Sequence, residues 1–174
     1  MGGGLGVQYN GEETKTPDEL LNVYAKIFKD RDEKIYIEPG RAIAANAGML
    51  ITEVEYCKNN FLIVDAAMND LIRPALYKAK HKVHEVVDNN ISKKTFDIVG
   101  PICETGDYLA KGVELSCKTG DLIAIGTAGA YGFSMSSKYN TRPRSAEILV
   151  DGDKFFLIRK RETLSELSAN EVES

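Results

Sequence analysis

The sequence predicts two parts: the last repeats of a TIM-type α/β barrel over residues 1–45, and a mainly antiparallel β-barrel or sandwich domain over residues 46–174. A glycine loop, a helix, a strand and a second glycine turn follow one another at the start, as in α/β barrel repeats. Short apolar segments separated by turn residues follow, which indicates antiparallel strands. With 174 residues, 43% of them hydrophobic, the chain can bury a full core.

The first part carries helix and strand signals in that order. A Thr-x-x-Glu capping box at Thr16 begins a helix, which apolar residues at helical spacing extend to about Lys29. Residues 34–38 predict a short buried strand that ends at the Pro39-Gly40 turn. We place the domain boundary within residues 42–48.

The second part consists of short strands and ends in a polar tail. An Asp-Gly-Asp turn at residues 151–153 predicts a hairpin between the last two strands. Residues 161–174 predict a short terminal helix around Leu164 and Leu167. The segments with strand-like composition and alternation are residues 49–58, 61–64, 81–87, 95–99, 122–126, 146–150 and 155–159.

Composition and charge limit the function classes. The net charge is −4 and no long basic segment is present, so we expect no nucleic-acid partner. No apolar run approaches the roughly 20 residues that span a bilayer, so we expect no membrane partner. Three cysteines without a Cys-x-x-Cys pair predict a reduced, cytoplasmic protein. His81 and His84 are interpreted as surface residues, and no metal site is expected.

Two early segments have the chemistry of an anion site. Gly2, Gly3 and Gly4 let backbone N–H groups approach a phosphate without a Cβ in the way. Glu38 and Arg41 lie at the carboxyl end of the predicted strand, where α/β barrels carry their active sites. They could hold a protonated ring nitrogen and an anionic group, although a turn with a surface ion pair explains this segment equally well.

Three later segments present polar groups beside turns. Arg73 could bind a carboxylate with Tyr77 one helical turn away, although such a pair is usually structural. Cys103 could donate a proton and Glu104 could bind an amine, whereas most free cysteines only pack. Tyr131 lies in a run of small residues that brings backbone close to a neighbour, which a glycine-rich hairpin would also explain.

Taken together and in this order, four segments resemble the diaminopimelate decarboxylase family of alanine-racemase-type pyridoxal-phosphate decarboxylases. They are Gly-Gly-Gly-Leu-Gly, Glu-Pro-Gly-Arg, Cys-Glu-Thr-Gly-Asp and Ala-Tyr-Gly-Phe-Ser-Met-Ser-Ser. The resemblance runs from Gly2 to about Lys160 and implies conversion of meso-diaminopimelate to L-lysine and carbon dioxide. Related ornithine decarboxylases carry Asp after the loop cysteine, so Glu104 favours the diaminopimelate branch.

The resemblance also implies a cofactor site for pyridoxal 5′-phosphate. Glu38 would keep the pyridine nitrogen protonated, which strengthens the ring as an electron sink. Tyr131 would lie against both cofactor and substrate. The phosphate would be bound by Gly2, Gly3, Gly4, Gly40 and Arg41.

For the substrate, the resemblance implies recognition at both ends of the molecule. Arg41, Arg73 and Tyr77 would hold the far carboxylate, and Glu104 would bind the ammonium group beside it. Cys103 would protonate the carbon that carbon dioxide leaves. The Cys-Glu loop enters the partner subunit's site in this family, so a homodimer with shared active sites is implied.

The family's Schiff-base lysine and ring-stacking histidine belong to earlier barrel strands that this sequence does not contain. We therefore expect the C-terminal portion of a decarboxylase, inactive alone, with residues 1 to about 40 mobile, self-associated or completed by another chain. Two other interpretations stay open. One is a related decarboxylase acting on ornithine, arginine or a carboxylated polyamine, and the other is a non-catalytic β dimerisation module.

Overall fold

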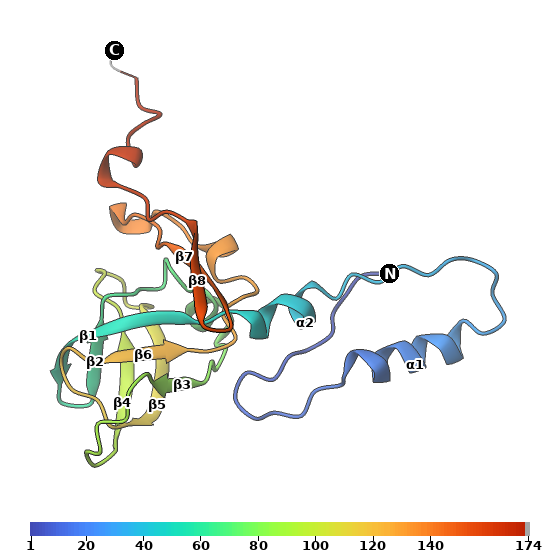
Figure 1. Cartoon of the computed structure of the whole chain (residues 1–174), viewed down its shortest axis with the longest axis horizontal. Helices are drawn as coiled ribbons and strands as arrows, with labels where there is room; N and C mark the ends of the chain where they lie inside the picture. Colours follow the sequence, from blue (N-terminus) through green and yellow to red (C-terminus); the bar gives the residue numbers. More distant parts are fainter. Residues whose placement is uncertain (173–174) are drawn as a thin grey trace.

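The structure is a computed structural model that describes residues 1–172, and it is dominated by one six-stranded sheet (Figure 1). The strands follow the order β3-β6-β1-β2-β4-β5, and neighbours are antiparallel except for the parallel pair β2 and β4. The end strands β3 and β5 contact each other, and Glu85 accepts hydrogen bonds from the backbone N–H and hydroxyl of Ser116. The sheet is thus nearly closed. The strands are β1 (Leu50–Lys58), β2 (Phe61–Val64), β3 (Val83–Glu85), β4 (Lys94–Val99), β5 (Tyr108–Leu115) and β6 (Leu122–Ile125).

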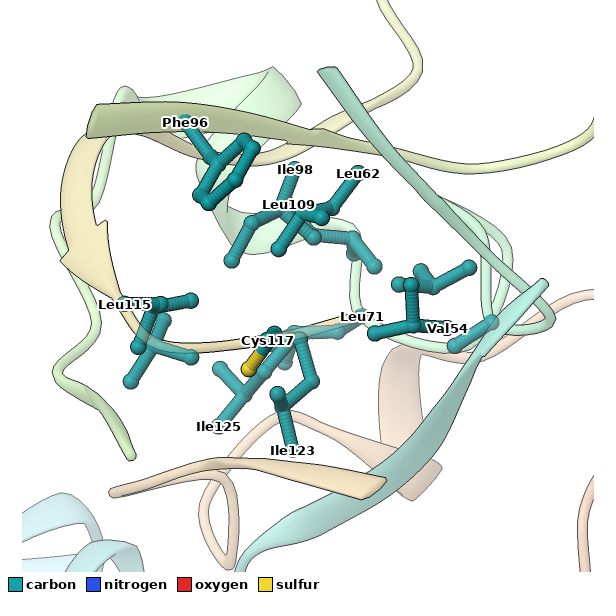
Figure 2. Close-up of a cluster of buried hydrophobic side chains, with 13 residues drawn as sticks. Val54, Leu62, Leu71, Phe96, Ile98, Leu109, Leu115, Cys117, Ile123 and Ile125 are labelled. Carbon is teal, nitrogen blue, oxygen red and sulfur yellow. The ribbon is translucent and has the colours of Figure 1, made fainter. Parts of the chain in front are cut away.

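The core lies inside this barrel, where every strand contributes at least one apolar side chain (Figure 2). Alternation along the strands turns these residues inward, because successive side chains in a strand point to opposite faces. Leu71, from the loop after β2, belongs to the same cluster. The largest side chains with almost no exposure are Val54, Leu62, Val64, Leu71, Ile98, Leu109, Leu115, Ile123 and Ile125.

The mainly antiparallel β-barrel domain is confirmed, with two differences in its strands. The strand expected over residues 81–87 is shorter, and β5 was not predicted at all. Gly112 interrupts the alternation of β5 with a positive φ of 65°, and the register with β4 shifts nearby. Such a bulge hides the period-2 pattern by which a strand is recognised.

The predicted final hairpin forms a separate two-stranded sheet of β7 (Glu147–Asp151) and β8 (Lys154–Arg159). Gly152 in its turn has a φ of 60°, as tight hairpin turns require. Apolar side chains on both strands, Val150 and Phe155 among them, are exposed. The hairpin therefore adds nothing to the barrel core.

The helix predicted after Thr16 is confirmed as α1 (Pro17–Ile27), with both hydrogen bonds of its capping box present. None of its residues is buried, and Figure 1 shows it apart from the strands. A second helix, α2 (Gly40–Ala44), continues into a 3-10 turn at Ala45–Ala47 that leads to β1. None of the helices within residues 1–172 is long and apolar enough to cross a membrane.

Two predicted elements are wrong. Residues 34–38 are extended but form no strand, because no strand within residues 1–49 lies beside them to complete a hydrogen-bonded ladder. The terminal helix is only a 3-10 turn, η4 (Leu164–Glu166), whose Leu164 is exposed and packs against no core. Residues 173–174 of that predicted helix lie outside the described residues.

Candidate active site

Four of the predicted site residues line one open cavity of about 810 Å³. Arg41 comes from α2, Arg73 and Tyr77 from the short helix α3 (Arg73–Tyr77), and Tyr131 from the loop after β6. Tyr9 and Tyr131, which are 122 positions apart in the sequence, thus meet at one place. The fold gathers the predicted far-carboxylate site, which sequence spacing alone could not establish.

Arg73 is the charged centre of this cavity. Its side chain is only 7% exposed, and its guanidinium carbon lies 5.3–5.4 Å from the ring centroids of Tyr9, Tyr77 and Tyr131. Within residues 1–172 the guanidinium donates no hydrogen bond and meets no carboxylate, and Nε is buried without a partner. Buried arginines are normally paired. The missing counter-charge marks a place for an anionic group of a ligand.

The cavity's own acidic residue does not serve as that counter-charge. Glu12 lines the cavity, but its carboxylate accepts hydrogen bonds from the backbone N–H groups of Tyr9, at 3.0 Å, and Asn10, at 2.6 Å. These bonds lower the pKa of Glu12, with the one from Asn10 largest. Glu12 therefore shapes the loop beside the cavity and leaves Arg73 available.

Two residues near Arg73, Tyr9 and His81, were not predicted as part of the site, and His81 was predicted at the surface. His81 is buried, not at the surface as predicted, and its ring lies edge-on to Tyr9 at 4.8 Å. Nδ1 lies 2.9 Å from the carbonyl oxygen of Gly126, whereas Nε2 and the Tyr9 hydroxyl are buried without a partner. Burial lowers the pKa of His81, so the imidazole stays neutral beside the Arg73 charge. His84 is exposed, as expected.

Tyr131 is positioned by close backbone contact with the α2 region. The Gly129 N–H donates to the carbonyl of Ala45 at 3.0 Å, and a Cβ on Gly129 would collide with the carbonyl oxygen of Ala44. Tyr131 itself has a φ of 64°, which a tyrosine adopts only where its surroundings enforce it. The run of small residues predicted to allow close approach does so here.

The glycine loop lies against the Glu-Pro-Gly-Arg turn. A Cβ on Gly3 would collide with the carbonyl oxygen of Glu38, whereas Gly2, Gly4 and Gly40 have open space where a Cβ would stand. In the described part of the chain, the N–H groups of Gly2, Gly3 and Gly4 donate to no protein acceptor. Consecutive backbone N–H groups without a protein acceptor fit a phosphate group.

The Cys103-Glu104 loop lies elsewhere and does not line the Arg73 cavity. Cys103 and Glu104 are both exposed. The loop is held by the buried Asp107, whose carboxylate accepts hydrogen bonds from the backbone N–H groups of Met68, at 2.7 Å, and Ile102, at 3.2 Å. One chain thus presents the predicted proton donor and the predicted carboxylate site at separate places.

Comparison with known proteins places this arrangement in a family. Residues 19–129 match the family model of the pyridoxal-dependent decarboxylase, C-terminal sheet domain. The chain belongs to the pyridoxal-dependent decarboxylase family. Diaminopimelate decarboxylase of Pseudomonas fluorescens is 54% identical to this chain over 175 residues, covering 98% of the chain and 42% of the relative.

Solved structures agree with this family assignment. A crystal structure from Aquifex aeolicus matches with a TM-score of 0.93 and 45% identity, covering 98% of the chain and 44% of that structure's chain. Diaminopimelate decarboxylase from Helicobacter pylori, complexed with L-lysine, matches with a TM-score of 0.90 and 44% identity over 97% of the chain and 43% of its own. The chain thus spans less than half the length of these relatives.

Proposed function

We propose that this chain is the carboxy-terminal part of a diaminopimelate decarboxylase, which converts meso-diaminopimelate to L-lysine and carbon dioxide. The observation that carries the proposal is the buried Arg73 charge, which meets no counter-ion among residues 1–172, in a cavity with Arg41, Tyr77 and Tyr131. The names of relatives about 50% identical over nearly the whole chain support the substrate.

The cavity binds the carboxylate at the far end of the substrate. Arg73 supplies the fixed positive charge, Arg41 a second charge at the rim, and Tyr77 an aromatic wall on Arg73. A guanidinium binds a carboxylate through paired, charge-assisted hydrogen bonds, and a low-dielectric pocket strengthens them. A substrate that lacks the second carboxylate leaves Arg73 unpaired, so the cavity selects an amino acid with two carboxylates.

Pyridoxal 5′-phosphate, when bound, supplies the electron sink for decarboxylation. Glu38 would keep the pyridine nitrogen protonated, and Tyr131 would lie against the bound group. The phosphate would be held by the backbone N–H groups of Gly2, Gly3 and Gly4 and by the charge of Arg41. The N–H of Gly40 donates to the carbonyl of Glu38 at 2.8 Å, so Gly40 would contribute close approach without a side chain.

Cys103 and Glu104 act in the active site of a second copy. Cys103 delivers a proton to the substrate carbon from which carbon dioxide has left, and Glu104 receives the far ammonium group. Their exposure, and their separation from the Arg73 cavity of their own chain, supports a homodimer with shared active sites. All three cysteines are free thiols, which suits the reducing cytoplasm.

The two parts of the chain have different places in the whole enzyme. Residues 1–45 complete an α/β barrel, and residues 46–174 form the sheet domain. The helix α1 without a buried residue supports this division, because its apolar face is left for other barrel elements. A lysine/ornithine decarboxylase and an arginine decarboxylase share the fold at only 21% identity, so no observation favours their substrates.

The test is an exchange of this chain into a longer relative. The 42% of the Pseudomonas fluorescens enzyme that matches is replaced by residues 1–174, and carbon dioxide release from meso-diaminopimelate is measured with added pyridoxal 5′-phosphate. We expect release by this chimera and none by the 174-residue chain alone. A chimera that folds and binds the cofactor but releases no carbon dioxide would falsify the proposed function.

A further inference from the structure

Glu104 is held in place by a tyrosine that lies 35 positions further along the chain. The hydroxyl of Tyr139 donates a hydrogen bond of 3.0 Å to Oε2 of Glu104, and the backbone N–H of Gly106 donates one of 3.2 Å to Oε1. Both carboxylate oxygens therefore have a donor. We propose that Tyr139 is a positioning residue that fixes the Glu104 carboxylate in the orientation in which it receives the substrate's ammonium group.

The segment that carries Tyr139 is itself anchored on both sides. Before it, Ser137 and the buried Asn69 exchange hydrogen bonds, with the Ser137 N–H donating to the Asn69 carbonyl at 2.9 Å. After it, the Arg142 guanidinium donates to the backbone carbonyl of Asp65. Tyr139 lies between these anchors, in the 3-10 turn η3 (Tyr139–Thr141).

The backbone of that turn supports a role in positioning. Asn140 and Thr141 have φ values of 58° and 56°, two consecutive residues in the left-handed region without a glycine. Asparagine adopts this region readily, whereas a β-branched threonine does so at a free-energy cost and only where its surroundings enforce it. The strained Thr141 lies in the same turn as Tyr139, so the turn sets the direction from which the tyrosine approaches Glu104.

Two further hydrogen bonds, both to Asp107, connect the Glu104 loop to the segment that leads into the helix that carries Arg73. Asp107, at the end of the Cys103-Glu104 loop, accepts hydrogen bonds from the backbone of Met68 and Ile102, and Met68 precedes α3 by only a few residues. The loop of Cys103 and Glu104, the segment before α3 and the turn of Tyr139 therefore support one another. Tyr139 contributes the hydrogen bond to the Glu104 carboxylate.

The charge on Glu104 agrees with this geometry. Hydrogen bonds from Gly106 and then from Tyr139 lower the pKa of Glu104, and the neighbouring carboxylate raises the pKa of Tyr139. The Glu104 carboxylate thus stays ionised and can accept, and the Tyr139 hydroxyl stays protonated and can donate. Cys103 and Asp107 are the other titratable groups near this pair.

The proposal rests on the proposed function for the role of Glu104, but its geometry is testable without it. In the 174-residue chain, the Glu104 carboxyl is titrated by carbon-detected NMR in wild type, Tyr139→Phe and Tyr56→Phe. Tyr56 is exposed, so Tyr56→Phe is the control: it removes a tyrosine hydroxyl at a site away from Glu104. We expect a higher Glu104 pKa in Tyr139→Phe alone, and equal values in all three would overturn the contact.

The effect of Tyr139 on the reaction is tested in the chimera by a double-mutant cycle with Glu104→Gln. Loss of one hydrogen bond to a charged group should raise KM for meso-diaminopimelate about tenfold in Tyr139→Phe, with a smaller change in kcat. Tyr56→Phe should change neither. In the Glu104→Gln background, Tyr139→Phe should have little further effect.

An unchanged KM in Tyr139→Phe, or a full tenfold effect that persists without the Glu104 carboxylate, would overturn the positioning role. If instead the wild-type chimera releases no carbon dioxide from meso-diaminopimelate, the proposed function fails. The NMR titration then still decides whether Tyr139 holds Glu104. The two failures are thereby distinguishable.

Discussion

Replacement of Arg73 by methionine separates a functional arginine from a structural one. Methionine keeps much of the length and apolar volume of the side chain but removes the charge. Arg73 is 7% exposed and has no ionic partner among the described residues, so its charge is desolvated without compensation. The effective cost of burying such an ion is several kcal/mol, even after relaxation.

The aromatic rings around Arg73 offset part of that cost. Three ring centroids lie within 5.4 Å of its guanidinium carbon. Each such contact contributes about 0.5–1 kcal/mol at an exposed site and more when desolvated, so the three together contribute at least roughly 1.5–3 kcal/mol. Because the desolvation cost is at least as large, we expect Arg73→Met to leave the free energy of unfolding unchanged or raise it by up to about 2 kcal/mol.

The assay is guanidinium chloride unfolding of the 174-residue chain, with Arg144→Met as the control. Arg144 forms a two-pronged pair with Glu162, so its loss should lower stability, in the opposite direction. In the chimera, Arg73→Met should raise KM for meso-diaminopimelate by about 10- to 100-fold, because a charged hydrogen-bonded partner is lost. A loss of more than about 2 kcal/mol of stability with KM unchanged would refute the reasoning and make Arg73 a structural residue.

Three further predictions concern the cofactor loop, the buried histidine and a buried thiol. Gly3→Ala should weaken binding of pyridoxal 5′-phosphate to the chimera far more than Gly2→Ala, since only the Gly3 Cβ meets the Glu38 backbone; equal dissociation constants would contradict this. His81→Asn should remove part of the acid sensitivity of unfolding: the lowered pKa of His81 stabilises the fold above about pH 6.5, and that stabilisation is lost as the pH falls. Parallel stability curves for wild type and variant between pH 5 and 8 would count against it. Burial raises the pKa of the Cys117 thiol to about 11, so iodoacetamide at pH 8 should label the other two cysteines first, and mass spectrometry of partly labelled chain checks the order.

The barrel was predictable because its strands carry strong local signals. Alternating apolar residues and the Asp-Gly-Asp turn depend on near neighbours in sequence, so β1 and the β7–β8 hairpin were predicted at nearly the right places. The strand β5 was missed since Gly112 introduces a bulge, and residues 34–38 form no strand because a parallel strand needs neighbours that these residues lack.

Some contacts of the candidate site also follow from near neighbours in sequence, and others depend on the fold. Arg73 and Tyr77 are separated by one helical turn, so their contact follows from local spacing. The burial of His81 against Tyr9, and the bond from Tyr139 to Glu104, depend on which loops the closed sheet brings together. His81 and His84, three positions apart on a predicted strand, were interpreted as surface residues. Nothing local in the sequence shows that a tyrosine 72 positions earlier covers the His81 ring.

The central claim is that the Arg73 cavity reads a second carboxylate on the substrate, and substrate preference tests it most directly. The measurement is kcat/KM of the chimera for meso-diaminopimelate and for L-ornithine, which lacks the far carboxylate, in wild type and Arg73→Met. We predict a strong preference for meso-diaminopimelate that largely disappears when Arg73 is replaced. A wild-type chimera that uses L-ornithine equally well, or a preference that survives the loss of Arg73, would contradict the claim.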